Sequence, residues 1–212
     1  MTRAWSRIES GEYEQLPLRA HTLLKQVPLH DVWRVDLPGG GPNRTVEDIR
    51  VLLARLRASG ELNWGVRGLF RMRSLLGVLF RWDRADSEEY ASPYNSRLTP
   101  EDRRESLVRP GTVDGPFRVL YVRAHESLGE IRNATVHAFL AMALRPTETG
   151  YRLYWAIYVR PVGLISPLYM AAIDPFRRLF VYPAILRHIH RAWVAAYTSS
   201  AGNSGGSPKR AG

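Results

Sequence analysis

The sequence predicts an α+β fold, in which helices pack on one side of an antiparallel sheet. Two segments in the first half of the chain repeat apolar residues with helical spacing. Three runs in the second half, FRVLYVR, ATVHAFLAMALR and YRLYWAIYVR, are rich in β-forming residues. The last two runs are separated only by PTETG, a turn of hairpin length, which predicts that they pair as antiparallel neighbours.

The first half of the chain is predicted to form one strand and two helices. Residues 32–37 alternate in polarity and lead into a glycine run, which indicates a strand that ends at a turn. Residues 44–60 carry apolar side chains at helical spacing and end at Gly60. A second amphipathic helix is predicted over 64–82. Residues 83–116 are polar and interrupted by prolines, so we expect them to be mostly irregular, with a short helix begun by Thr99-Pro100-Glu101.

The two strands of the predicted hairpin are apolar on both faces. A sheet that is covered on one side only should alternate more cleanly between apolar and polar residues. We therefore expect the additional apolar side chains to line an internal cavity or to be covered by a partner.

The stretch LISPLYMAAIDPFRRLFVYP is too polar to cross a membrane. Asp174, Arg177 and Arg178 interrupt it, and the longest uncharged run nearby, Pro161 to Ile173, falls short of the roughly 20 residues that a spanning helix needs. No transmembrane segment is predicted.

The prolines of this stretch predict a bent C-terminal helical arm. Ser166-Pro167 and Asp174-Pro175 each place a capping residue before a proline, which predicts a new helix start at each pair. Pro183 lacks such a cap, so we expect it to kink a continuing helix. From Phe176 onward, helical spacing gives one aromatic-rich face, formed by Phe176, Leu179, Pro183, Leu186, His190, Trp193 and Tyr197.

Composition indicates a single domain. The chain has 212 residues, 45% of them hydrophobic, which fits one domain over residues 1–197. The Gly/Ser-rich residues 198–212 are expected to form a disordered tail. There is no cysteine, which excludes disulfides and thiolate chemistry, and the N-terminal sequence has no secretory apolar run, so a cytoplasmic location is expected.

The formal net charge of +10 does not by itself predict a nucleic-acid partner. Lys25 and Lys209 are the only lysines among 30 basic residues. So strong an excess of arginine is what a GC-rich coding sequence produces, and no nucleic acid is expected as a partner.

Two patterns that suggest cofactors or metals fail on their spacing. GGGPNR follows a strand and precedes a helix, but Arg44 stands where a dinucleotide-binding loop needs its third glycine, so a plain turn is expected. His188 and His190 would lie roughly 200° apart around a helix and cannot converge on one ion. We therefore expect neither a metal nor a cofactor.

The segment EIRNATVH holds the candidate catalytic residues. Glu130 could reach the imidazole of His137 if the chain bends at Asn133, and a histidine held by a carboxylate in an apolar cavity can act as a general base. The alternative is a buried polar cluster that satisfies its own hydrogen bonds. Tyr154 and Tyr158 share one strand face, where they could orient a ligand carbonyl or simply pack.

The chain also resembles a known family. The runs DVWRVDLPGG, NATVHAFLAMAL and RPVGLISPLYMAAIDPFRRLFVYPAIL, together with the start from Trp5 to Glu9, resemble a bacterial family catalogued as a domain of unknown function within the START-like (SRPBCC) helix-grip superfamily. The resemblance covers most of the chain from Trp5 to Trp193, and YMAAIDPFRRLFVYPA is its most specific part. No motif of the family is matched in residues 83–116.

The resemblance implies a curved antiparallel sheet, with two short helices, that grips a long kinked C-terminal helix over a cavity for lipids, polyketides or other apolar molecules. Related domains also occur fused behind dinucleotide-binding reductase domains, which implies such a reductase as a partner. The resemblance brings no catalytic residue with it, because the chemistry of the family is undescribed. The fold implies a ligand-binding domain but does not imply a particular reaction.

The leading hypothesis is a soluble domain that binds a hydrophobic small molecule, such as a lipid, polyketide or terpenoid, between the sheet and the C-terminal helix. The residues expected to contact the ligand are His137, Phe139, Tyr154, Trp155, Tyr158, Phe176 and Trp193.

Two hypotheses of other classes remain open at this point. One is a cofactor-independent cyclase, dehydratase or isomerase, with His137 as base, Glu130 orienting it, and Tyr154 or Tyr158 as acid. The other is a peripheral module that meets an anionic membrane surface through basic residues of the second helix. These residues are Arg67, Arg71, Arg81 and Arg84. Neither the ligand nor the oligomeric state follows from the sequence.

Overall fold

A computed structural model describes residues 4–61, 92–132, 136–162 and 166–198. The strands are β1 (Trp5–Ile8), β2 (Leu29–Pro38), β3 (Val113–Asp114), β4 (Phe117–Val122), β5 (Glu126–Arg132), β6 (Val136–Thr147) and β7 (Gly150–Pro161). The helices are α1 (Ser10–Glu14), α2 (Arg19–Leu23), α3 (Val46–Ala58), α5 (Pro93–Ser96), α6 (Pro100–Glu105), α7 (Ser166–Phe176), the π-helix η1 (Arg177–Val181) and α8 (Tyr182–Tyr197).

The fold is α+β, as predicted, and within the described residues its strands form one open antiparallel sheet of seven strands. Their order is β1-β2-β7-β6-β5-β4-β3. The predicted hairpin is its centre: β6 and β7 pair along their whole length, from Val136 opposite Pro161 to Thr147 opposite Gly150. The predicted first strand, β2, lies between β1 and β7, so an early strand pairs with the last strand of the sheet.

Sequence analysis did not identify β1, β3 and β5. β1 and β3 are only 4 and 2 residues long, too short for an alternating pattern to show. In β5, the sequence ESLGEIR places Glu126, Gly129 and Glu130 in a strand of 7 residues. Both glutamates are buried, so their charge hides a strand that lies inside the sheet.

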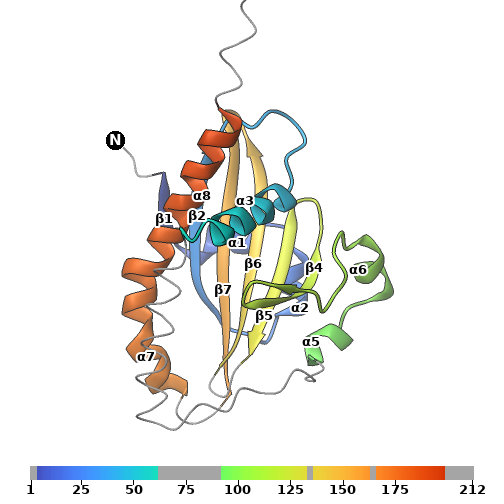
Figure 1. Cartoon of the computed structure of the whole chain (residues 1–212). Helices are drawn as coiled ribbons and strands as arrows, with labels where there is room; N and C mark the ends of the chain where they lie inside the picture. The colour runs from blue at the N-terminus through green and yellow to red at the C-terminus, as the bar shows by residue number, and fades with distance from the viewer. Residues whose placement is uncertain (1–3, 62–91, 133–135, 163–165, 199–212) are drawn as a thin grey trace, which may run out of the picture.

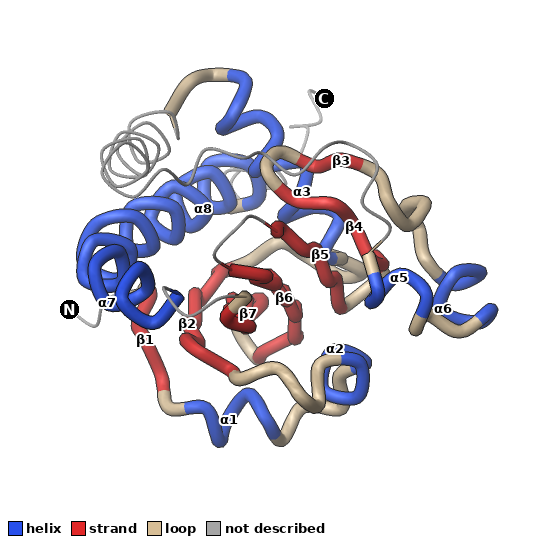
Figure 2. Tube along the Cα trace, turned by 90° about the horizontal axis from the view of Figure 1, so that it is seen from below, coloured by secondary structure: helices blue, strands red, loops and turns tan. Residues whose placement is uncertain are grey.

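Helices cover both faces of the sheet, whereas the sequence predicted helices on one side only. Figure 2 shows α3, α7 and α8 on one side of the curved sheet and α1 and α2 on the other. Each face carries its own apolar core, one including Trp155 and Trp193, the other Phe139 and Tyr158. The apolar character of both strand faces is therefore explained by cover from the chain itself. With 5 residues each, α1 and α2 are too short to show helical periodicity.

The predicted helix after the glycine run is confirmed as α3. Thr45 and Asp48 form a capping box at its start, in which the Asp48 carboxylate accepts a hydrogen bond from the Thr45 backbone N–H at 2.8 Å. Its buried stripe packs on the sheet beside α8 and consists of Val46, Ile49, Leu52, Leu53 and Leu56. The short helix predicted at Thr99-Pro100 is likewise present, as α6.

The C-terminal arm is long and begins at Ser166, as predicted, but its interruptions differ from those expected. Pro175 lies inside α7, so the prediction of a new helix start at Asp174-Pro175 is wrong. The Asp174 carboxylate does not cap a helix; it accepts hydrogen bonds from His30 at 2.6 Å and from Arg177 at 3.2 Å. The Asp174 carboxylate is therefore bound by the side chains of His30 and Arg177 and not by backbone N–H groups of a helix start.

At Pro183, where a kink in a continuing helix was expected, the preceding residues form a π-helix. The five residues of η1 lie immediately before α8, where Pro183 is in the first turn. Proline lacks the N–H that the carbonyl four residues earlier would accept, and its ring crowds that carbonyl. Widening the preceding turn to π geometry relieves both problems, and the helical path continues from α7 into α8.

Several expectations lie outside the described residues. These are the second amphipathic helix over 64–82, the arginines proposed to meet a membrane, and the tail from residue 199 onward. Within the described part of the chain, no helix has both the length and the apolar character to cross a bilayer.

Candidate functional site

An apolar cavity lies between the sheet, α3 and α8. Its volume is about 130 Å³. The apolar side chains of its wall include Leu53, Phe117, Val119, Leu140, Met142, Trp155 and Ile185. These seven side chains come from α3, from strands β4, β6 and β7 and from α8. Both helices lie against the same face of the sheet (Figure 1).

Gly129 explains why this part of the core is not filled. It lies in β5 between Val119 of β4 and Leu140 of β6, and it contributes no side chain to the cavity wall. A Cβ atom at this position would come within 3.2 Å of the Phe117 Cβ. Glycine inside a strand often marks a close approach of another group, and here it lets Phe117 fold over the strand.

Two arginines and one aspartate form the polar side of the cavity. Arg50 donates to Asp114 from Nε at 3.0 Å and from Nη2 at 2.8 Å. Arg57 donates from Nη2 to the other oxygen of Asp114 at 2.5 Å. Arg50 also donates to Glu47 at 2.5 Å. All three residues of this triad, Arg50, Arg57 and Asp114, line the cavity.

The size of the cavity limits what it can hold. An apolar cavity of about 150 Å³ in another protein holds one benzene molecule. The volume here therefore suits roughly one six-membered ring or a short alkyl chain. Trp155, in its wall, has a buried indole N–H for which the described residues supply no hydrogen-bond partner.

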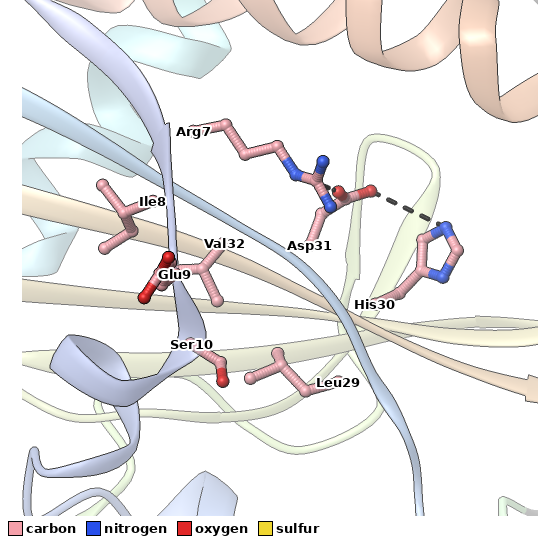
Figure 3. Close-up of a pocket in the computed structure, with 8 residues that line it drawn as sticks. All are labelled: Arg7, Ile8, Glu9, Ser10, Leu29, His30, Asp31 and Val32. Atoms are coloured by element: carbon pink, nitrogen blue, oxygen red, sulfur yellow. Dashed lines mark ion pairs between the residues drawn. The ribbon is translucent and has the colours of Figure 1, made fainter.

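A second, more polar groove lies at the edge of the sheet, between the end of β1 and the start of β2. Its volume is about 530 Å³. Figure 3 shows Arg7 and His30 on either side of Asp31 in this groove. The Asp31 side chain is fully buried, and Arg7 Nε lies 2.9 Å from its Oδ1.

The groove continues into an ion-pair network with the C-terminal arm. Arg178 Nε lies 3.0 Å from Asp31 Oδ1, and His30 Nε2 lies 2.6 Å from Asp174 Oδ2. Arg177 bonds Asp174 as well as the Tyr182 hydroxyl. Every charged group of this network already has an opposite charge beside it, so the network joins β2 to α7 and η1 and its groups are occupied by one another.

The predicted contact between Glu130 and His137 is present. His137 Nε2 lies 2.7 Å from Glu130 Oε2, and both side chains are buried. The Ser92 hydroxyl donates to the same carboxylate oxygen at 2.6 Å, and the rings of Tyr94 and Phe139 pack on the imidazole. The cluster satisfies its own hydrogen bonds, as the structural alternative for this segment supposed.

Tyr154 and Tyr158 lie on the same sheet face as His137 but bind other groups. The Tyr154 hydroxyl donates to Glu12 at 2.7 Å, and the Tyr158 hydroxyl lies 3.1 Å from His21 Nδ1. Burial, with smaller contributions from nearby acidic groups, raises the pKa of Tyr158 to about 12. Such a phenol is a weak proton donor at neutral pH.

The seven residues predicted to contact a ligand divide between the two faces of the sheet. His137, Phe139, Tyr154 and Tyr158 lie on the face covered by α1 and α2, with none of them in the wall of either cavity described above. Trp155 and Trp193 belong to the opposite core, and Phe176 lies in the arm that covers it. Of the seven, Trp155 lines the apolar cavity.

Sequence analysis missed the arginine pair at this cavity. The only signal was that Arg50 and Arg57 are seven residues apart on one predicted helix, and so on one face. Their common partner, Asp114, lies 64 residues from Arg50, in a segment that was expected to be irregular. No pattern in the sequence pairs these groups.

The histidines and the glycine loop considered for metals and nucleotides make hydrogen bonds to backbone carbonyls. His188 Nδ1 lies 2.7 Å from the Ala184 carbonyl, whereas His190 Nδ1 lies 2.8 Å from the carbonyl of Asp36 in β2. In the glycine loop, Arg44 donates to the Gly40 carbonyl at 2.6 Å. Across residues 4–61, 92–132, 136–162 and 166–198, no three His, Cys, Asp or Glu side chains are grouped to hold a metal ion.

Comparison with known proteins gives a family without a described activity. The model of the family DUF2867, described as "Protein of unknown function", matches residues 23–184, which include every residue of the apolar cavity wall except Ile185. No curated protein matches the chain.

Proposed function

The chain belongs to the DUF2867 family, and we propose that it binds a small hydrophobic molecule in the cavity between the sheet, α3 and α8. The observation that carries the proposal is the apolar wall of this cavity, which lies on the sheet face that the C-terminal helix covers. The START-like helix-grip arrangement, in which a curved sheet holds a C-terminal helix over a ligand cavity, agrees with this location.

The cavity volume narrows the classes of ligand. A space for about one ring accommodates part of a lipid, polyketide or terpenoid, so a larger member of these classes would have to extend through the polar side or separate α8 from α3. The indole N–H of Trp155 has no hydrogen-bond partner among the described residues, which supports a ligand that carries an oxygen acceptor, because a buried donor without a partner costs about 1–3 kcal/mol.

Binding has more support than catalysis by His137. The imidazole is packed between aromatic rings and bonded to Glu130, and it borders neither cavity described here. A general base must reach the proton that it removes. The catalytic alternative would therefore need the cover of His137 to open, and a reductase partner rests on the family resemblance alone.

Titration with small neutral ligands tests the proposal. We expect benzyl alcohol and n-hexanol to bind the full chain in calorimetry and to raise its melting temperature. Leu53→Phe should abolish this binding, because Leu53 is in the cavity wall and the larger side chain fills the space. Val51→Phe, at an exposed position of the same helix, is the matched control and should leave binding unchanged.

Two results would contradict the proposal. One is an absence of heat and of any melting shift with either ligand. The other is equal loss of binding in the Leu53 and Val51 variants, which would place the ligand outside the cavity.

A further inference from the structure

We propose that the ligand of the apolar cavity is a small monocarboxylic acid, whose carboxylate binds Arg50 and Arg57 by exchange with Asp114. This inference rests on the proposed function and names the chemical class of its ligand. It is carried by the position of the triad, which forms the charged side of a cavity whose other walls are mostly apolar.

The two arginines are fixed in a geometry that suits a carboxylate. Each comes from α3, and together they contact both oxygens of Asp114 at distances of 2.5 to 3.0 Å. The side chain of Arg50 is only 11% exposed, and that of Arg57 is 32% exposed. A planar guanidinium presents paired N–H donors that match the two oxygens of a carboxylate.

The charge balance of the triad favours exchange. Two cations share Asp114, while the other acid near Arg50, Glu47, is 42% exposed and one turn away on the same helix. An exposed pair of this kind is screened by water. Without Asp114, the two guanidinium groups would face the cavity with one weak counter-charge, and a carboxylate from a ligand would replace the missing one.

The position of Asp114 makes it the part that can move. It ends β3, which has two residues and lies at the edge of the sheet, paired only with β4 in the described residues. Gly115 follows with φ +61°, a conformation that glycine adopts without strain, and it lies against the Arg57 side chain. Arg50 and Arg57, by contrast, belong to a helix of 13 residues packed on the core.

The apolar part of such an acid would fill the remaining space. The wall beyond the triad includes Phe117, Leu140, Met142 and Trp155. One ring or a short alkyl chain fits the volume, and the carboxylate at one end of the molecule would then lie at the arginines. This arrangement predicts a ligand of the size of phenylacetate or hexanoate.

Three probes separate the two halves of the ligand. Phenylacetate carries both the ring and the charge, phenylacetamide has the ring without the charge, and acetate has the charge without the ring. Calorimetry on the full chain should show phenylacetate binding about tenfold or more tighter than either of the others, because hydrogen bonds to charged groups are the stronger ones. This preference should weaken at high salt.

Variants of the triad should change the preference in opposite directions. Arg57→Gln should reduce the ratio of phenylacetate to phenylacetamide affinity to near one. Asp114→Asn should raise it severalfold, because the competing carboxylate is gone while both arginines remain. Arg55→Gln, at an exposed position of the same helix, should leave the ratio unchanged. A thermal melt of each variant checks that it is folded.

The outcomes distinguish this inference from the function on which it rests. Equal affinity for phenylacetate and phenylacetamide would overturn the inference and leave apolar binding in place. An unchanged ratio in Asp114→Asn would show that the triad only ties the β3–β4 hairpin to α3. Equal affinity for phenylacetate and acetate would refute the apolar cavity, and no binding by any probe would overturn both proposals.

Discussion

Buried carboxylates are the residues on which the contacts between distant segments depend. Glu126 accepts hydrogen bonds from the backbone N–H groups of Arg19 at 2.9 Å and Ala20 at 2.8 Å, and from the Tyr121 hydroxyl. It thereby satisfies the free N–H groups at the start of α2, which has no side-chain cap of its own. Glu126, at the start of the internal strand β5, thus fixes the position of α2, a helix that sequence analysis did not predict.

Asp102, in α6, accepts hydrogen bonds from Arg19 of α2 and should make the stability of the protein depend on pH. Arg19 donates to it from Nε at 2.9 Å and from Nη2 at 2.9 Å, Arg123 at 3.0 Å, and the Thr99 N–H at 2.9 Å. Burial is the largest single influence and raises the pKa of Asp102. The hydrogen bonds and the charge of Arg19 together outweigh burial, so the pKa lies below its ordinary value.

Because the folded state lowers the pKa of Asp102, its contribution to stability is complete above the unfolded pKa of about 3.9 and is lost as the pH falls through the lower folded pKa. We expect Asp102→Asn to lower the free energy of unfolding by about 1–3 kcal/mol at pH 7. The deficit should shrink below pH ~4, where the Asp102 carboxylate of the unfolded parent becomes protonated while that of the folded parent is still ionised. Urea unfolding from pH 3 to pH 7 measures this, and a deficit that stays constant with pH would contradict the assignment.

At the residue scale, sequence distance decided which contacts could be predicted. Glu130 and His137 are 7 residues apart, so a reversal of the strand direction was enough to suggest their contact. The partners of Glu126 in α2 are more than 100 residues away, and Asp114 and Arg50 are 64 apart. Such pairs depend on the complete topology of the sheet, which a local pattern does not contain.

At the scale of elements, Pro175 tests whether α7 is one helix. Its position inside α7 means that the carbonyl of Ala171, four residues earlier, lacks the N–H that it would otherwise accept. We expect Pro175→Ala to raise the free energy of unfolding, by up to about 3 kcal/mol. If a new helix began at Pro175, the same change would instead be neutral or slightly destabilising.

Asp174→Ala completes this comparison. It should lower the free energy of unfolding by about 1–3 kcal/mol, because His30 and Arg177 lose their common acceptor. Chemical denaturation of the two single variants beside the parent decides the ranking. If Pro175→Ala is destabilised, Pro175 lies at the start of a helix and not in its interior.

Long elements could be predicted because their periodicity extends over several turns or pleats. The 12-residue strands β6 and β7 and the 13-residue helix α3 have clear patterns. The five-residue helices α1 and α2 do not, and the π-helix follows from an interplay between Pro183 and the continuing helix that spacing alone does not show. The candidate cavity was missed in detail for a related reason, since its opening depends on Gly129 and on contacts between strands.

At the scale of the whole molecule, the C-terminal helix is what closes the cavity face of the sheet. α8 packs on β2 and α3, and its Ile185 is part of the cavity wall. Whatever loosens the docking of α8 should therefore affect both stability and the proposed binding, even when the altered residue is outside the cavity.

Trp193 is the residue that best tests this coupling. It is fully buried, and its indole Nε1–H donates to the Pro38 carbonyl at 3.0 Å, next to the rings of Tyr151 and Tyr197. The absence of a side chain at Gly40 leaves room for the indole, since a Cβ atom there would lie 2.7 Å from the ring. The tryptophan therefore fixes α8 to the end of β2.

We expect Trp193→Phe to lower the free energy of unfolding by about 1 kcal/mol, because the Pro38 carbonyl loses the hydrogen bond from the indole. Faster hydrogen exchange should appear in α8 before it appears in β6 and β7, since the sheet keeps its own pairing. Trp5→Phe is the matched control, because the indole N–H of Trp5 has no acceptor within the described residues. Equal loss of stability in both variants would show that ring volume, and not the bond to Pro38, holds α8 against the sheet.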